Sequence, residues 1–74
     1  MILDYNKLWK LMIDKNINKT KLCKQAKIST NAMAKMGRNE SVPLETLVKV
    51  CAVLECDLND IVEVKREVDK NGIN

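Results

Sequence analysis

The sequence predicts a small all-α domain of five short helices, with a short strand pair formed by its two ends. Three observations support this fold class. The chain has 74 residues, which is the size of one small domain. Its apolar residues recur in short blocks at the i, i+3, i+4 spacing of amphipathic helices. Asn, Ser and Gly residues separate these blocks, as expected where helices end and loops begin.

The first two helices are expected at residues 6–15 and about 19–27. In the first, the apolar stripe beside Trp9 consists of Leu8, Leu11 and Met12. Asn16 and Asn18 interrupt the chain before the second helix. The second helix places on one side its apolar residues Leu22, Cys23 and Ala26. Its polar and basic side chains are therefore expected to face away from the core.

The third helix is expected at about 30–37. Ser29 precedes it, and a Ser hydroxyl can accept hydrogen bonds from the free N–H groups of a first helical turn. At about 100° per residue, an arc of about 140° contains no acid and is formed by Thr30, Asn31, Ala34, Lys35 and Arg38. The opposite side is formed by Ala32, Met33 and Met36. We therefore expect one face to dock on the domain and the other to face outward.

The fourth helix, at residues 44–54, is the most hydrophobic. Its core stripe is predicted to be Leu44, Leu47, Val48, Cys51 and Leu54. A fifth short helix is expected to begin at Asp57 and to turn inward Leu58, Ile61 and Val62. The alternation of Val62 and Val64 predicts an extended segment, which the first five residues can pair with. We expect residues 1–68 to form a single domain and residues 69–74 to be a flexible tail.

Charge is distributed unevenly along the chain. Residues 1–38 hold nine Lys and Arg against two acids, a net charge of +7. Residues 39–74 hold four Lys and Arg against eight acids, a net charge of −4. Such a separation produces a directional field that can steer the protein toward a polyanion. The alternative is a solvated, Lys-rich surface without a partner, and charge alone leaves both open.

Several classes of function are not expected. The chain has no His, which removes the commonest general base and every Ser-His or Cys-His nucleophile. Its three Cys lack the paired spacing of zinc sites, so we expect buried free thiols and no metal. No cofactor motif, membrane-length apolar run or signal peptide is evident. We therefore expect a non-enzymatic, cytoplasmic protein without a cofactor or a small-molecule ligand.

Two segments resemble a known family. The segment "TKLCKQAKISTNAMAKM" resembles the helix-turn-helix of the phage repressor and Cro class, called the XRE family. The segment "SVPLETLVKVCAVLECDLNDIV" resembles the family's closing signature, and Leu47, Leu54, Leu58 and Ile61 are all in register. The resemblance covers roughly residues 5–62. Cys51 and Cys56 around "VLE" resemble a small-regulator subgroup, and the chain resembles the VanU type of small regulator.

The sequence departs from the family pattern at three positions. Lys27 stands where the turn usually has Gly. Either Lys27 adopts the left-handed conformation at a cost of ~1 kcal/mol, or the turn differs slightly. Gly37 stands where many members have Glu, and Asn39 where they have Gly. Asn tolerates the left-handed region, so the loop remains feasible.

The resemblance implies a sequence-specific, double-stranded DNA-binding transcriptional regulator with its third helix in the major groove. The implied base-reading residues are Thr30, Asn31, Ala34 and Lys35. Asn31 would contact adenine, Lys35 guanine, and Ala34 a thymine methyl group. The implied contacts to the DNA backbone are Lys19, Thr20, Lys21, Arg38 and Asn39. One such helix reads few base pairs, so we expect a homodimer on an operator of two half-sites.

A second class of function remains open from the sequence. An antitoxin-like protein or adaptor can use the same fold to bind another protein. The basic residues clustered with Asn31 on one helix favour DNA. An RNA-binding protein is less favoured because no aromatic side chain is free to stack on bases.

Overall fold

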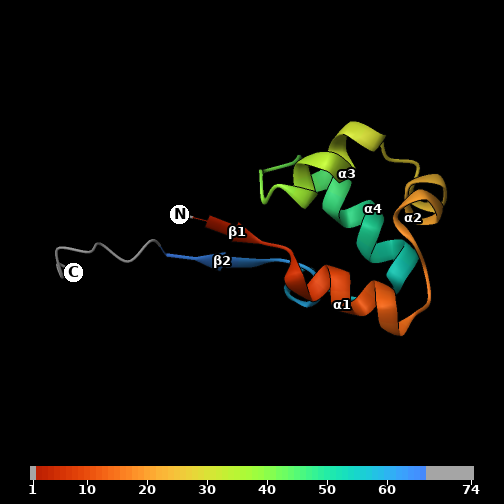
Figure 1. Cartoon of the computed structure of the whole chain (residues 1–74), viewed down its shortest axis with the longest axis horizontal. Helices are drawn as coiled ribbons and strands as arrows, with labels where there is room; N and C mark the ends of the chain where they lie inside the picture. Colours follow the sequence, from red (N-terminus) through yellow and green to blue (C-terminus); the bar gives the residue numbers. More distant parts are fainter. Residues whose placement is uncertain (1, 67–74) are drawn as a thin grey trace, which may run out of the picture.

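The computed structural model describes residues 2–66. Within this range the chain forms four α-helices, a short 3-10 helix and two short strands (Figure 1). Their order is β1 (Ile2–Asp4), α1 (Asn6–Asp14), α2 (Lys19–Ala26), α3 (Thr30–Gly37), α4 (Leu44–Leu54), η1 (Leu58–Asp60) and β2 (Glu63–Lys65). None of the helices in residues 2–66 combines the length and the apolarity needed to cross a membrane. The four predicted helices before residue 55 are confirmed.

The fifth predicted helix is wrong as an α-helix, because the segment forms only the 3-10 turn η1. Asp57 and Asp60 cap this turn. The Asp57 N–H donates to Asp60 Oδ2 at 2.9 Å. Eight residues separate Leu54 from Glu63, and because Glu55 is left-handed and Asp57 is extended, the remainder forms only one turn. Ile61 is fully buried as predicted, whereas Leu58 is exposed and Val62 half-buried.

The predicted strand pair is confirmed. β1 and β2 run antiparallel, with Ile2 opposite Lys65 and Asp4 opposite Glu63. Figure 1 shows the two strands extending side by side away from the helices. Lys65 Nζ lies 2.8 Å from Asp4 Oδ2, so the two residues form a diagonal ion pair across the strands. The predicted domain end at residue 68 and the predicted flexible tail, residues 69–74, lie outside the described residues.

The core is formed mainly by aliphatic, Met and Cys side chains from all four α-helices. Its fully or nearly fully buried members are Tyr5, Leu8, Met12, Leu22, Cys23, Ala26, Met33, Met36, Leu47, Val50, Cys51, Leu54 and Ile61. Tyr5 is buried with its hydroxyl donating to the Glu40 carbonyl oxygen at 3.0 Å. This bond ties the start of α1 to the loop after α3.

The predicted core stripe of α4 is partly wrong. Leu47, Cys51 and Leu54 are buried, but Leu44 is 61% and Val48 52% exposed. Val50, which the predicted stripe did not include, is fully buried. The inward arc of α4 is therefore centred on Leu47 and Leu54, and Leu44 and Val48 lie outside it.

All four α-helices end in the same way. A residue one or two positions after each helix has a positive φ between 54° and 57°, at Asn16, Lys27, Asn39 and Glu55. In each case the N–H of the next residue donates to the carbonyl five residues earlier, as in Ile28 to Cys23 and Glu40 to Lys35. This is the Schellman helix end, which usually uses Gly. Of the two alternatives for Lys27, the structure adopts the left-handed one, with φ 57° and ψ 44°.

Candidate nucleic-acid interface

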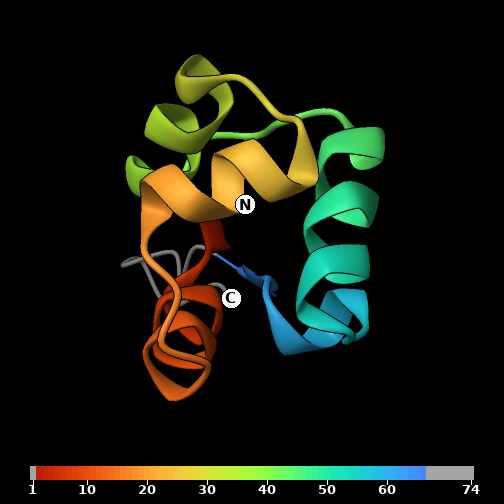
Figure 2. The same cartoon turned by 90° about the vertical axis from the view of Figure 1, so that its right-hand side faces the viewer.

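Helices α2 and α3 form the predicted helix-turn-helix. Figure 2 shows them next to each other at the top of the molecule, with α4 at the side and α1 below. α2 packs against both α3 and α4. Three residues, Lys27 to Ser29, connect the two helices, and Ile28 packs against the core between them. The turn is therefore held by a partly buried side chain in its middle and by a helix end on each side.

Side-chain caps fix where both helices begin. The Lys21 N–H donates to Asn18 Oδ1 at 2.7 Å, so Asn18 caps α2. The Ala32 N–H donates to Ser29 Oγ at 3.0 Å, which confirms Ser29 as the cap of α3. Each cap satisfies one of the free N–H groups of a first helical turn and thereby sets the orientation of the side chains that follow.

The two faces of α3 are arranged as predicted. Met33 and Met36 are buried and attach the helix to the core. Among the predicted base-reading residues, Thr30, Asn31 and Ala34 are exposed and Lys35 is half-buried. The outward face of α3 therefore offers short polar and basic side chains to a partner. Whether these residues read bases remains a prediction.

The predicted backbone contacts lie at two places. Lys19, Thr20 and Lys21 form the first turn of α2, and all three are exposed. Arg38 and Asn39 follow the end of α3 and are also exposed.

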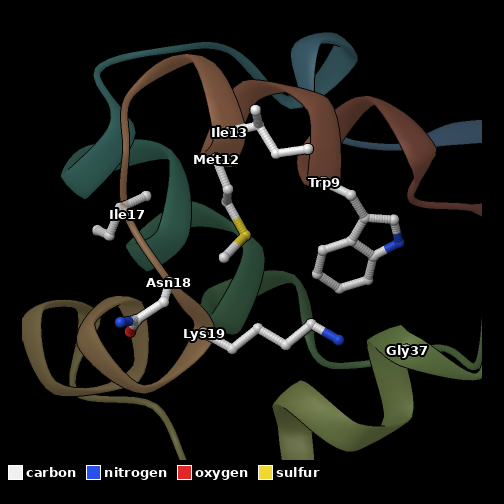
Figure 3. A pocket seen from close by; sticks show the side chains of 7 residues that line it. All are labelled: Trp9, Met12, Ile13, Ile17, Asn18, Lys19 and Gly37. Atoms are coloured by element: carbon white, nitrogen blue, oxygen red, sulfur yellow. The ribbon is translucent and has the colours of Figure 1, made fainter.

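A pocket of about 390 Å³ joins these two places (Figure 3). Its lining includes Lys19 at the start of α2 and Gly37 at the end of α3. The remaining lining comes from α1 and the loop that follows it, namely Trp9, Met12, Ile13, Ile17 and Asn18. The start of α2 and the end of α3 therefore lie close together, although eighteen positions separate Lys19 from Gly37 in the sequence.

Lys19 and Arg38 have different immediate partners. The Lys19 ammonium lies 4.6 Å from the centre of the Trp9 ring. Arg38 Nε donates to Glu40 Oε2 at 2.8 Å, and a second guanidinium nitrogen donates to Oε1 at 3.3 Å. The hydrogen bond from Arg38 lowers the pKa of the Glu40 carboxyl, and the bond to Glu40 raises the pKa of Arg38. Both groups therefore stay charged near neutral pH.

Asn39 is held by the start of the chain. Its Oδ1 accepts from the Tyr5 N–H at 3.4 Å. Asn39 also adopts the left-handed conformation with φ 57°, as expected for an Asn at a position where the family usually has Gly. The side-chain NH₂ of Asn39 remains available to donate to another acceptor.

The three cysteines are free thiols. Cys23 and Cys51 are buried and Cys56 is half-buried. Burial, with smaller contributions from the neighbouring Cys56, raises the pKa of Cys51 to about 11. Burial also raises the pKa of Cys23 and of Cys56. These thiols therefore stay protonated at neutral pH and pack as small apolar side chains.

Sequence reasoning missed two residues of this surface. The sequence pattern places Trp9 only beside the apolar stripe of α1, and it indicates no role for Glu40. Trp9 contacts Lys19 across a loop, and no local pattern pairs residues ten positions apart on different helices. A signal for Glu40 did exist, because Glu40 is the first acid after Asp14 and lies two positions after Arg38.

Comparison with known proteins identifies the family. The chain matches the Cro/C1-type HTH DNA-binding domain over residues 7–67. It is also similar to the crystal structure of the transcriptional regulator VanUg, Form II, with 42% sequence identity and a TM-score of 0.84. That match covers 89% of this chain and 88% of the other. No curated protein matches the chain. Since the family match spans most of the chain and includes both helices of the motif, this protein belongs to the Cro/C1-type helix-turn-helix family.

Proposed function

We propose that this protein is a transcriptional regulator that binds a double-stranded DNA operator sequence-specifically, with α3 in the major groove. The observation that carries the proposal is the outward face of α3, which has no acid and is held in place by two buried Met residues. An α-helix fits the ~12 Å width of the major groove of B-DNA. The similarity to the regulator VanUg supports the same role.

The proposed base contacts follow from the donors and acceptors on this face. Asn31 has both a donor and an acceptor, which match the N6 and N7 groups of adenine. Lys35 donates to O6 or N7 of guanine. The methyl group of Ala34 packs on a thymine methyl, and the Thr30 hydroxyl donates to or accepts from a base edge.

The proposed backbone contacts lie on either side of the pocket beside α3. Lys19, Thr20 and Lys21 donate to phosphates from the first turn of α2, and Arg38 and Asn39 donate from the end of α3. The pocket lined by Lys19 and Gly37 supports this arrangement, because the start of α2 and the end of α3 both border it. Such contacts set the register of the protein on DNA without reading the sequence.

We further propose that two copies act together as a homodimer in the cytoplasm. One α3 helix contacts only a few base pairs, and useful specificity requires more. A twofold-symmetric dimer on two half-sites would supply these contacts. An operator with inverted half-sites one helical turn apart, or a multiple of it, is the corresponding expectation.

One observation favours a second function, that of an antitoxin-like protein or adaptor. Leu44 and Val48 lie one turn apart on α4, and both are more than half exposed. Exposed apolar side chains grouped in this way are typical of surfaces that bind another protein. The two functions differ in the expected salt dependence of binding to duplex DNA, which is steep only for a DNA-binding protein.

The test is the salt dependence of binding to a labelled mixed-sequence duplex, followed by fluorescence anisotropy. We expect affinity to fall steeply with salt. Lys19→Ala and Arg38→Ala should each reduce the slope of log K against log salt by roughly 0.9 for every phosphate that the missing side chain would neutralise. Lys7→Ala is the matched control, because Lys7 donates instead to the carbonyl oxygen of Asn59 in η1. Binding that does not respond to salt would favour the protein-partner function.

A further inference from the structure

We infer that Trp9 is a positioning residue for DNA binding, because its indole ring holds the Lys19 ammonium at the start of α2. The inference rests on the proposed function, in which Lys19 contacts a phosphate. Trp9 lies on α1, outside the helix-turn-helix, and belongs to none of the proposed DNA contacts. Trp9 would affect the affinity for DNA only by orienting Lys19.

The geometry is that of a cation–π contact. The Lys19 Nζ lies 4.6 Å from the centre of the indole ring, within the ~6 Å range of such contacts. Figure 3 shows the Lys19 side chain extended from the start of α2 toward the ring. Trp9 is half-buried and packs against the hydrophobic core, so the ring is a fixed platform. The backbone of Lys19 is fixed as well, because Asn18 caps the same helical turn.

This contact prepares Lys19 for a phosphate. A free Lys side chain has many rotamers and loses that freedom when it binds. Lys19 is already held near one position by the ring before any DNA arrives. An ammonium has three N–H donors, so the ring can occupy one side while the others donate to a phosphate oxygen.

No acid competes for Lys19. Residues 15–38 contain no Asp or Glu, and none of the ion pairs found within residues 2–66 involves Lys19. Arg38 differs, because Glu40 already occupies its guanidinium. An aromatic ring orients a cation without neutralising its charge. Lys19 is therefore oriented by the ring and has no acidic partner among the described ion pairs, as suits a phosphate contact.

A double-mutant cycle tests the inference. Trp9→Leu, Lys19→Ala and the double variant are compared with the wild type for binding to a labelled mixed-sequence duplex. We expect Trp9→Leu to weaken binding roughly twofold to fivefold. In the Lys19→Ala background, Trp9→Leu should have almost no further effect, because the residue through which Trp9 acts is missing. Trp9→Phe keeps an aromatic face and should recover part of the affinity.

Two further measurements separate positioning from a general effect on folding. Thermal unfolding of each variant reports whether removal of the indole destabilises the core. Trp9 is the only Trp in the sequence, so its fluorescence reports the Lys19 contact directly. We expect Lys19→Ala to change the emission of the free protein, whereas Lys7→Ala should leave it unchanged.

The outcomes are distinct. If Trp9→Leu weakens binding equally with and without Lys19, the positioning role is wrong and the proposed function stands. If Lys19→Ala leaves the Trp9 emission unchanged, the contact does not form in solution and the inference also fails. If the wild type shows no salt-dependent binding to any duplex, the proposed function fails and Trp9 has no DNA contact to support.

Discussion

Arg38 and Glu40 form a bidentate ion pair directly after α3. The shorter of its two hydrogen bonds, from Nε to Oε2, is 2.8 Å long. Both side chains are exposed. A carboxylate presents to a guanidinium the same pair of oxygen acceptors that a phosphate presents. Glu40 therefore competes with a DNA phosphate for two of the five N–H donors of Arg38.

Glu40→Gln should strengthen binding to DNA. It removes a negative charge beside Arg38 and makes all five N–H donors of Arg38 available to a phosphate. We expect an affinity gain on the order of twofold and a steeper dependence on salt, measured by anisotropy with a mixed-sequence duplex. Glu45→Gln is the matched control, since Glu45 pairs with Lys49 on α4 at 3.8 Å. Weaker binding by Glu40→Gln would show that the ion pair orients Arg38 rather than occupying it.

Asp4 and Lys65 should make stability depend on pH in acid. The hydrogen bond from Lys65, followed by the Asn6 N–H, lowers the pKa of Asp4 below its ordinary value of 3.8. A lowered pKa in the folded state means that the stabilisation is fully present above the unfolded-state pKa. It is lost as the pH falls through the lowered, folded-state pKa.

The measurement is thermal unfolding of Asp4→Asn and of the wild type from neutral pH down to a pH well below 3.8, the ordinary pKa of Asp. We expect the variant to be less stable at neutral pH, because its side chain cannot form the ion pair with Lys65. The two stabilities should converge once Asp4 of the wild type is protonated. An equal difference in stability at neutral and at strongly acidic pH would show that the charge of Asp4 does not matter.

Glu55→Gly should stabilise the protein. Glu55 has a φ of 54° at the end of α4, a conformation that costs an ordinary L-residue ~1 kcal/mol or more and Gly almost nothing. We expect a gain of about 0.5–1 kcal/mol in the free energy of unfolding, measured with denaturant. Lys24→Gly, in the last turn of α2, is the control and should instead destabilise the protein, by up to about 1 kcal/mol. If Glu55→Gly and Lys24→Gly both destabilise the protein, the inference that Glu55 is strained is wrong.

Much of the fold could be predicted because it rests on local patterns. The caps, the ends of the helices and the apolar faces of α1, α2 and α3 involve residues within one or two turns of each other. The strand pair was also predictable, since the alternation at Val62 and Val64 indicates extended chain. The left-handed Lys27 could be anticipated from the family position, but not decided from the sequence.

The features that could not be predicted depend on tertiary packing. α4 has apolar residues at almost every position from Leu47 to Leu54, so the pattern does not indicate which arc faces inward. Val50 is buried and Val48 is exposed, and which side of α4 faces inward is set by its packing against α2 and η1. For the same reason the Trp9–Lys19 contact is visible only in the structure.

Asn31 and Lys35 provide the sharpest test of the proposed site. They lie one turn apart on the outward face of α3, and the core requires neither side chain there. Asn31→Ala and Lys35→Ala should each leave the thermal midpoint nearly unchanged. Each should remove most of the preference for the operator, because a good bidentate base contact discriminates by ~1–3 kcal/mol.

The measurement is competition between an operator selected from a random duplex library and a scrambled duplex. Binding to the scrambled duplex should fall less for Asn31→Ala than for Lys35→Ala, since only the latter removes a charge. Asn59→Ala on η1 and Lys49→Ala on α4 are the matched controls and should keep the wild-type specificity ratio. If Asn31→Ala and Lys35→Ala keep that ratio as well, α3 does not read the sequence. The base contacts would then have to be assigned elsewhere, although the fold would be unaffected.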